Sequence, residues 1–426
     1  MPAKKKTDDK SLKELALLGG TSEASKIARC LLRYPEQALW GGYVHCPPGS
    51  LLDVTVKEFD QKTHAPLELP LFITLTLLSA VLLQRRVKLR IAGVKKVQEV
   101  FLWVMLLAQS GSLKSLTLSS ITDTIAEAGE KVHLWELSSV SGPAAFMQEF
   151  AGTGEQASKN HCLCIIEEAG QFRKKMRDGA PLEELKNVFI QIYDGCQVGR
   201  TTKAGKLEVD NPAISLFGIS VAEIFLQEVR PEDMLSGEMQ RQAIILCEPF
   251  DINARRHAIM KINLAKTRRE WKRLLQSIVH HEYTVTARTA KAFETIYKRL
   301  VEKFSADIPD SFLLRIMWSF HRYALVYHLL LGNGREQAIC KEAYAYAERI
   351  IERVLSDMAR TFRLTLSSET CKKLDQVEKW IEKHERIPTP RDIYRNFRNI
   401  KLGEPEILIR LALTNPNFAR LANEGR

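Results

Sequence analysis

The sequence predicts an α/β fold built on a mostly parallel sheet, and two observations support this. Between residues 52 and 249, short apolar runs typical of buried strands alternate with segments of helical periodicity. The composition, with 45% hydrophobic and 27% charged residues, is that of an ordinary globular protein. Strands that alternate with helices favour parallel pairing through crossover helices. The same composition excludes a collagen-like, coiled-coil or largely disordered chain.

Each element of this core is predicted from its own pattern. Apolar runs of strand length lie at residues 100–108, 131–137, 161–167, 214–220 and 243–248. Amphipathic helical segments lie between them at residues 115–127, 142–150, 182–193 and 221–228. Almost all of residues 254–363 also has helical periodicity, and turn signals set off a short C-terminal unit. We therefore expect a basic tail and N-terminal segment (1–51), a core (52–253), a helical domain (254–365) and a winged-helix-like unit (366–426).

Basic charge is concentrated in one part of the chain. The sequence has 62 Lys and Arg against 51 Asp and Glu, a net charge of +11, and residues 251–330 alone hold 15 against 7. Such a region is typical of a polyanion partner, although a solvated helix surface is the alternative. Within it, Arg315 and Arg322 are seven residues apart in an apolar helical stretch, so we expect them on one face. There they would pair with buried acids or reach a nucleotide across a subunit contact.

A phosphate-binding motif follows the first predicted strand of the core. Residues 108–115 read Ala-Gln-Ser-Gly-Ser-Leu-Lys-Ser before a helix, which approximates the P-loop pattern G-x-x-x-x-G-K-[ST]. Ala108 and Leu113 replace two glycines, but backbone N–H groups and the helix N-terminus hold the phosphates. We expect Lys114 to contact the β- and γ-phosphates and Ser115 to ligate magnesium. The residues expected to bind the nucleotide are Ser110, Gly111, Ser112, Leu113, Lys114 and Ser115; an ordinary strand-to-helix turn is the alternative.

Two carboxylates end the third predicted strand, about 50 residues after the P-loop. Residues 161–168 read His-Cys-Leu-Cys-Ile-Ile-Glu-Glu, the form of a Walker B motif with Glu where Asp is commoner at the first acid. We expect Glu167 to hold magnesium through water and Glu168 to polarise the attacking water. Cys162 and Cys164 alternate to one face of this strand, which favours core packing over metal binding. Two such elements in order predict a P-loop NTPase core that uses ATP and Mg²⁺.

Three later features fit an NTPase that works in a ring. Residues 194–206 resemble a glycine-bearing basic hairpin. Ser220 ends the fourth predicted strand, where a polar tip would sense the γ-phosphate. Arg241 precedes the fifth, where an arginine can be offered to the neighbouring subunit's nucleotide. The alternatives are a plain turn serine and a surface arginine, or an arginine held in a salt bridge within the chain.

Taken in order, these motifs resemble the primase-helicase-like P-loop NTPases of prophages, plasmids and phage satellites, which have an AAA+/RecA-like core. The resemblance covers residues 69–363. It is carried by the P-loop, Ser141-Gly142-Pro143, the Glu-Glu pair, Tyr193-Asp194-Gly195, Arg200-Thr201, Asn211-Pro212 and Ser236-Gly237 with Arg241. It implies an ATP-driven, ring-forming motor for replicating mobile DNA, often beside a primase. The residue before the P-loop lysine varies in that family, whereas Glu167 in place of Asp is a departure.

The C-terminal unit resembles a winged helix. Thr389 followed by Pro390 predicts a helix start. Cations then recur at helical spacing, on a face separate from the apolar residues, as in a helix that reads duplex DNA. These cations are Arg391, Arg395, Arg398 and Lys401. An amphipathic surface helix with no DNA role is the alternative.

The main hypothesis is therefore an ATP-dependent DNA motor, the replicative helicase of a mobile element, acting as a homo-oligomeric ring around single-stranded DNA. Arg200, Lys203 and Lys206 would line its DNA channel. The departures from the two NTPase motifs favour an alternative, a nucleic-acid-binding initiation protein whose NTPase site no longer hydrolyses. A phage-defence ATPase is a weaker third hypothesis.

We expect a cytoplasmic protein with no membrane partner. The eight cysteines are scattered with no Cys-x-x-Cys pair, and the Lys-rich start does not resemble a signal peptide. The longest apolar run, at residues 71–83, falls short of the ~20 residues needed to span a bilayer. His280-His281-Glu282 lacks the spacing of a metal site, so we expect a surface turn there.

Overall fold

The computed structural model describes residues 42–152, 157–177, 179–202, 205–229, 237–247, 262–305, 308, 310–397, 400, 405, 408, 409 and 412. The chain divides into two compact units, one of residues 36–362 and one of residues 363–426 with 1–35. The boundary expected near residue 253 lies outside the described residues.

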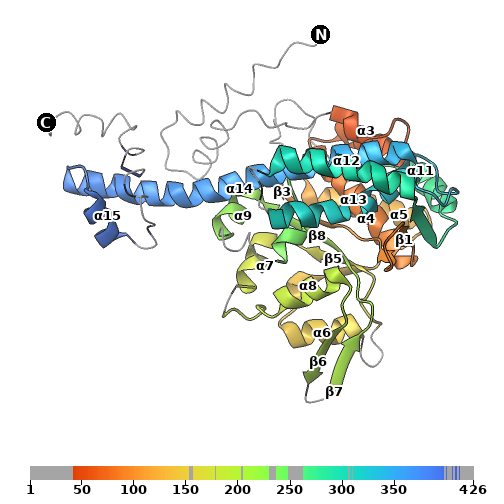
Figure 1. Ribbon diagram of the computed structural model, residues 1–426, viewed down its shortest axis with the longest axis horizontal. Helices are drawn as coiled ribbons and strands as arrows, with labels where there is room; N and C mark the ends of the chain where they lie inside the picture. Colours follow the sequence, from red (N-terminus) through yellow and green to blue (C-terminus); the bar gives the residue numbers. More distant parts are fainter. Residues whose placement is uncertain are drawn as a thin grey trace, which may run out of the picture. The chain divides into compact units, whose positions relative to one another are not determined.

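A five-stranded parallel sheet forms the centre of the larger unit (Figure 1). Its strands are β3 (Trp103–Ala108), β4 (Leu134–Glu136), β5 (Leu163–Ile166), β8 (Ser215–Val221) and β9 (Ala243–Leu246). They lie in the order β4-β5-β8-β3-β9, and every neighbouring pair is parallel. These are the five strands expected from the apolar runs, so the prediction of an α/β core with a mostly parallel sheet is confirmed.

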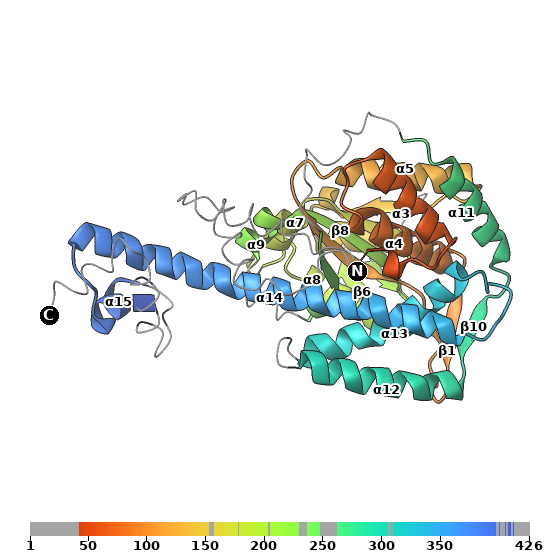
Figure 2. The same ribbon diagram turned by 90° about the horizontal axis from the view of Figure 1, so that it is seen from above.

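Helices surround this sheet. The helices of the larger unit and the α14 helix are η1 (Gly42–His45), α3 (Leu51–Lys62), α4 (Glu68–Gln84), α5 (Lys114–Glu127), η2 (Leu137–Ser139), α6 (Pro143–Ala151), α7 (Ala169–Lys175), α8 (Leu185–Asp194), α9 (Ala222–Glu228), η3 (Met239–Arg241), α11 (Ala265–Ser277), α12 (Ala287–Phe304), α13 (Asp310–Leu330) and α14 (Lys341–His384). Figure 2 shows α3, α4, α5 and α11 packed as one group. The apolar α4 is buried along nearly its whole length. Within the described residues, no helix is both long and apolar enough to cross a membrane.

Different helices cover the two faces of the sheet. Side chains alternate between the faces along each strand, so the contacts of neighbouring residues identify the helix on each face. The Oγ atoms of Ser79 in α4 and Ser215 in β8 lie 3.2 Å apart, so α4 covers the face to which Ser215 points. Trp103 pairs with Leu216 and therefore points to the opposite face. There its ring meets the ring of Phe189 in α8, with centroids 6.0 Å apart. The sheet is the middle layer between α4 and α8.

Side chains from α14 cover the edge strand β9. The Leu246 N–H donates to Asp357 Oδ2 at 3.3 Å, and the Leu246 carbonyl accepts from Arg353 at 3.3 Å. Arg353 also donates to Asp357 at 2.9 Å and to Glu68 of α4 at 3.2 Å. Burial raises the pKa of Asp357, although the charges of Arg353 and Arg360 oppose this. These side chains satisfy backbone groups that an edge strand would otherwise leave unpaired.

A second, small sheet was not expected. Its strands β1 (Lys88–Ile91), β2 (Gln98–Glu99) and β10 (Glu282–Val285) lie in the order β10-β1-β2, with β1 parallel to β10. The expected surface turn is therefore wrong at Glu282, which begins a strand and pairs with Lys88. The Arg90 guanidinium donates to both carboxylate oxygens of Glu282, at 2.6 and 3.0 Å. A four-residue strand paired across some 190 residues leaves too short a pattern to be recognised within a helical region.

The basic hairpin of the core is present. Strands β6 (Val198–Thr202) and β7 (Gly205–Val209) pair antiparallel directly after α8. The structure therefore places a two-stranded extension between α8 and β8, as expected from the glycine-bearing loop.

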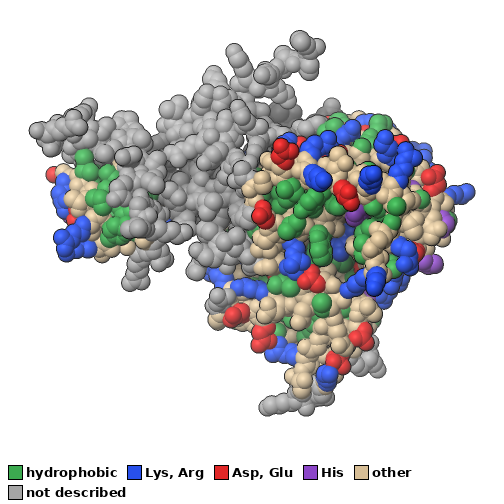
Figure 3. Space-filling model, viewed as in Figure 1, with side chains coloured by type: hydrophobic (Ala, Val, Ile, Leu, Met, Phe, Trp, Pro, Cys, Tyr) green, Lys and Arg blue, Asp and Glu red, His purple; other side chains and the backbone are tan. Residues whose placement is uncertain are grey.

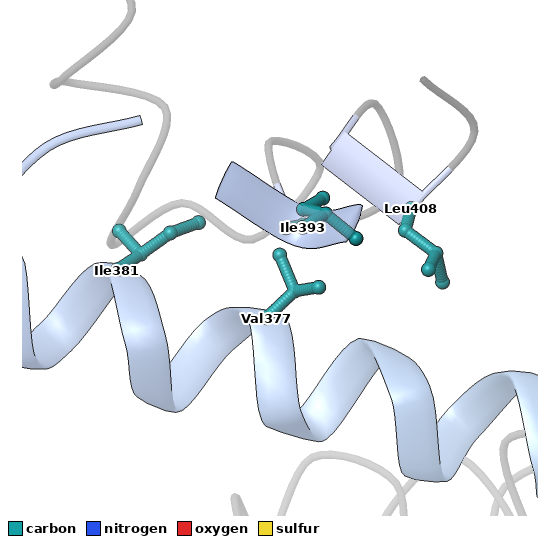
Figure 4. Close-up of a cluster of buried hydrophobic side chains, with 5 residues drawn as sticks. Val377, Ile381, Ile393 and Leu408 are labelled. Atoms are coloured by element: carbon teal, nitrogen blue, oxygen red, sulfur yellow. The ribbon is translucent and has the colours of Figure 1, made fainter. Parts of the chain in front are cut away.

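The C-terminal unit has its own small core. Figure 4 shows Val377 and Ile381 of α14 pointing toward Ile393 and Leu408. Ile393 belongs to α15 (Pro390–Asn396), which begins with a capping box between Thr389 and Asp392 and with proline in its first turn, as expected. The helix ends at Asn396, and Arg398 and Lys401, the last two cations of the expected basic face, lie outside the described residues. No strand occurs among the described residues of this unit.

Truncation of Trp103 tests the packing of the sheet against α8. Its indole Nε1 donates to the Ile214 carbonyl at 2.8 Å, and its ring is buried against α8. We expect Trp103→Ala to lower the free energy of unfolding by about 3–5 kcal/mol, measured by urea denaturation. Leu134→Ala, at an exposed position of β4, should change it by less than about 0.5 kcal/mol. Equal effects of the two substitutions would contradict this account of the core.

Candidate functional site

The carboxyl ends of β3, β5 and β8 lie side by side at one edge of the sheet, because all three strands are parallel and β8 lies between the other two. The P-loop leaves β3 after Ala108, and the two glutamates leave β5 after Ile166. Ser220 lies near the end of β8 and pairs with Leu107. The structure therefore brings the three predicted parts of the nucleotide site to one place.

The P-loop backbone turns through two residues with positive φ. Gly111 has φ of 78°, and Leu113 has φ of 60° and ψ of 29°, the left-handed helical conformation. α5 begins at the next residue, Lys114, so its free N–H groups face the loop. Leucine occupies the position where the P-loop pattern has glycine, and adopts a conformation that glycine accepts without strain. Within the same loop, Ser112 is buried, and Ser115 is exposed in the first turn of α5.

Lys114 is half-buried at the centre of this edge. Its Nζ donates to the Gln109 carbonyl at 2.9 Å, which holds the side chain back over the loop. Burial lowers the pKa of Lys114, and the charges of Glu168 and Glu223 oppose that shift. The ammonium group therefore lies within the electrostatic range of two carboxylates from different elements. A triphosphate placed on this loop would supply the negative charge that such a lysine can bind.

Glu167 and Glu168 both lie on the exposed turn between β5 and α7. Glu168 has φ of 50° and ψ of 51° and precedes the first residue of α7. Among the described residues, no group of three or more His, Cys, Asp and Glu side chains could hold a metal ion.

Ser220 is buried and accepts a hydrogen bond from the Gly170 N–H at 3.3 Å. Gly170 lies two residues after Glu168, so the hydroxyl of β8 is bonded to the turn that carries the predicted catalytic carboxylate. A β-carbon at Gly170 would lie 3.2 Å from the Cα of Phe225 in α9. This is closer than ordinary van der Waals contact, so glycine at this position favours the close approach of α7 and α9.

Two residues of the site were missed from the sequence. Glu223, in the first turn of α9, is the second carboxylate whose charge acts on Lys114. Its position just after a buried strand was a usable signal. The buried His64 lies 3.3 Å through Nε2 from the Gly111 carbonyl, to which it can only donate. It comes from the segment between α3 and α4, and no sequence pattern linked that segment to the P-loop.

Arg241 lies away from this edge. It ends η3 and precedes β9, so it is at the amino end of the sheet. Its side chain is only 3% exposed and donates to Asp194 Oδ2 at 2.7 Å, with its guanidinium 5.5 Å from the Tyr193 ring centroid. Its charge is thus engaged within the chain, as in the salt-bridge alternative.

The predicted DNA-contacting cations fall into three groups. Arg200 and Lys206 lie on the hairpin and pair with Glu184 and with Glu208 respectively, the latter at 2.6 Å. Arg391 and Arg395 are exposed on α15. Lys203, Arg398 and Lys401 lie outside the described residues.

No protein-family model matches this chain, and no curated protein matches it either.

Gly170 provides a direct test of the close approach at the site. In Gly170→Ala the new β-carbon would meet the Phe225 backbone and, at 3.4 Å, the Ser220 hydroxyl. We expect a loss of about 1–3 kcal/mol in the free energy of unfolding, since backbone atoms must move to admit it. The measurement is urea denaturation of the full chain. Parental stability would mean that the turns after β5 and β8 are not held together in this way.

Proposed function

We propose that this protein is an ATP-dependent DNA motor, the helicase of a replicating mobile element, that works as a ring around single-stranded DNA. The observation that carries the proposal is the convergence of Lys114, Glu168 and Ser220 on one sheet edge. These are the three groups that phosphoryl transfer to water requires: a cation for the phosphates, a carboxylate for the water, and a polar group near the γ-phosphate.

The order of the strands supports this proposal. Because β8 lies between β3 and β5, the loop after β3 and Glu168 leave the sheet on either side of a single strand, which suits a γ-phosphate and an attacking water bound between them. The half-buried setting of Lys114 strengthens its interaction with an anion, since charges interact more strongly outside bulk water. Leu113 adopts the left-handed conformation that glycine has at this position of the P-loop pattern, which supports the P-loop assignment despite the substitution.

In the proposed reaction, backbone N–H groups of the P-loop and of the first turn of α5 bind the phosphates. Lys114 neutralises charge on the β- and γ-phosphates, and Glu168 accepts the proton of the attacking water. Magnesium, when bound, would offset further phosphate charge. His64 keeps the Gly111 peptide oriented through its bond to the carbonyl.

The remaining parts of the proposal concern DNA. The hairpin of β6 and β7 would face single-stranded DNA in the ring, and the C-terminal unit would act as a winged helix on duplex DNA through Arg391 and Arg395. A primase would be a further partner. The alternative, an initiation protein with a non-hydrolysing site, is favoured by one observation: Arg241 is bound to Asp194 rather than available to a neighbouring subunit.

Substitution of Lys114 tests the nucleotide site. We expect Lys114→Ala to weaken ATP binding at least tenfold, because no other described cation lies on the loop; isothermal titration with ATP and Mg²⁺ measures this. Lys131→Ala, an exposed lysine that precedes β4 at the opposite edge of the sheet, is the matched control and should bind ATP like the parent. Parental affinity in Lys114→Ala would reject the P-loop assignment.

Substitution of Glu168 separates binding from hydrolysis. Glu168→Gln keeps the shape of the side chain but removes the proton acceptor, so DNA-stimulated phosphate release should fall by a factor of about 100 or more. ATP affinity should stay within about threefold of the parent. The neighbouring Glu167→Gln should lose less activity, and the reverse order would assign the base to Glu167. A parental protein that binds ATP and releases no phosphate would favour the initiation-protein alternative.

A further inference from the structure

Basic side chains gather at the amino edge of the sheet, on the end of α8. Asp194, the last residue of α8, accepts from Arg241 at 2.7 Å and from Arg315 of α13 at 3.4 Å. Lys96 donates to the Asp194 and Gly195 carbonyls, both at 3.2 Å. We call Lys96, Asp194, Arg241 and Arg315 the Asp194 cluster. Arg241 and Arg315 share the one carboxylate and Lys96 donates only to backbone carbonyls, so the cluster holds three cations and one anion.

A fourth cation, Arg322, is influenced by the charge of Asp194 and adds to the positive charge of the cluster. Arg322 is 8% exposed, and its guanidinium lies 3.8 Å from the Phe101 ring centroid and 5.1 Å from that of Tyr193. Burial lowers its pKa, and the tyrosine, Asp194 and Glu99 oppose the shift. Glu99 itself pairs with Lys88 at 3.4 Å. Asp194 and Glu99 are therefore outnumbered by Lys88, Lys96, Arg241, Arg315 and Arg322, the cations that they contact or influence.

Beside the cluster, α13 exposes large apolar side chains. Trp318 is 61% exposed and Leu314 is 43% exposed, and their spacing of four residues puts them on one face of the helix. The Arg315 guanidinium lies 5.6 Å from the Trp318 ring centroid. From Ser319 onward, α13 is buried, so the exposed face is confined to its first half. Figure 3 shows hydrophobic side chains next to basic ones on the face where α12 and α13 lie.

This surface lies at the base of the hairpin. α8 ends at Asp194, and β6 begins four residues later at Val198. On the hairpin itself, the described cations Arg200 and Lys206 already have carboxylate partners. Unbalanced positive charge and an exposed aromatic ring occur together at the base instead.

We propose that single-stranded nucleic acid binds at this surface, with a base stacked on Trp318 and phosphates held by Arg315 and Lys96. Stacking on an exposed indole suits any base, and cations next to it follow the backbone without reading sequence. An excess of cations fits a polyanion better than it fits a second copy of this chain, whose net charge is +11. This inference rests on the proposed function for one point, that the partner is a single-stranded nucleic acid. It places the main contact with that strand at the base of the hairpin rather than on the hairpin strands.

The test is binding of a fluorescein-labelled 20-nucleotide oligo(dT) to the full chain, measured by anisotropy without nucleotide. Trp318→Ala should raise the dissociation constant roughly 5- to 150-fold, the range for loss of one stacked base. Trp318→Phe, which keeps a ring, should recover most of the affinity. Arg315→Gln should reduce the slope of log affinity against log salt by about 0.7, the value for one phosphate contact on a single strand.

Three outcomes are informative. Unchanged oligo(dT) affinity in Trp318→Ala, with parental circular dichroism, would overturn the site. Parental affinity together with a loss of self-association in light scattering would overturn it in favour of a contact between copies. Lys114→Ala should bind oligo(dT) like the parent, so failure of the ATP site and failure of this surface are distinguishable.

Discussion

The parallel pairing of β8 with both β3 and β5 is the constraint on which the rest of the structure depends. Main-chain hydrogen bonds hold β8 between the strand that leads to the P-loop and the strand that leads to the two glutamates. The polar residues that follow β3 and β5 and end β8 then lie together at the carboxyl edge of the sheet. Residues at the amino edge, such as Arg241, lie away from them. A change in this strand order would separate Lys114 from Glu168 without altering any motif.

Close backbone approach then sets the finer geometry of the site. Leu113 and Glu168 each adopt a left-handed conformation directly before a helix, so α5 and α7 both begin at the same edge of the sheet. Gly170 lets α9 pack against α7, which brings Ser220 and Glu223 into the same region as Glu168. Strained residues of this kind persist where the surrounding structure holds them, and here they lie at the proposed site of chemistry.

The two edges of the sheet differ in their charge. At the carboxyl edge, one half-buried lysine lies within range of carboxylates, an arrangement that a phosphate group would complete. At the amino edge, Arg241, Arg315 and Lys96 surround Asp194, and an exposed tryptophan lies next to them. A nucleotide at the first edge and a nucleic-acid strand at the second would bind to opposite ends of one rigid sheet, which is suited to couple the two.

The sequence by itself determined the five core strands, the turn from β3 into α5 and the carboxylates after β5, because each depends on a local pattern of apolar and polar residues. It did not reveal β1 and β10, whose pairing joins segments some 190 residues apart. Only the tertiary structure decided the contacts of His64, Glu223 and Arg241, since a hydrogen bond or charge from a distant element cannot be read from local spacing. Arg241 illustrates this best: its position before β9 suited a contact with another subunit, but the end of α8 supplies Asp194 as its partner within the chain.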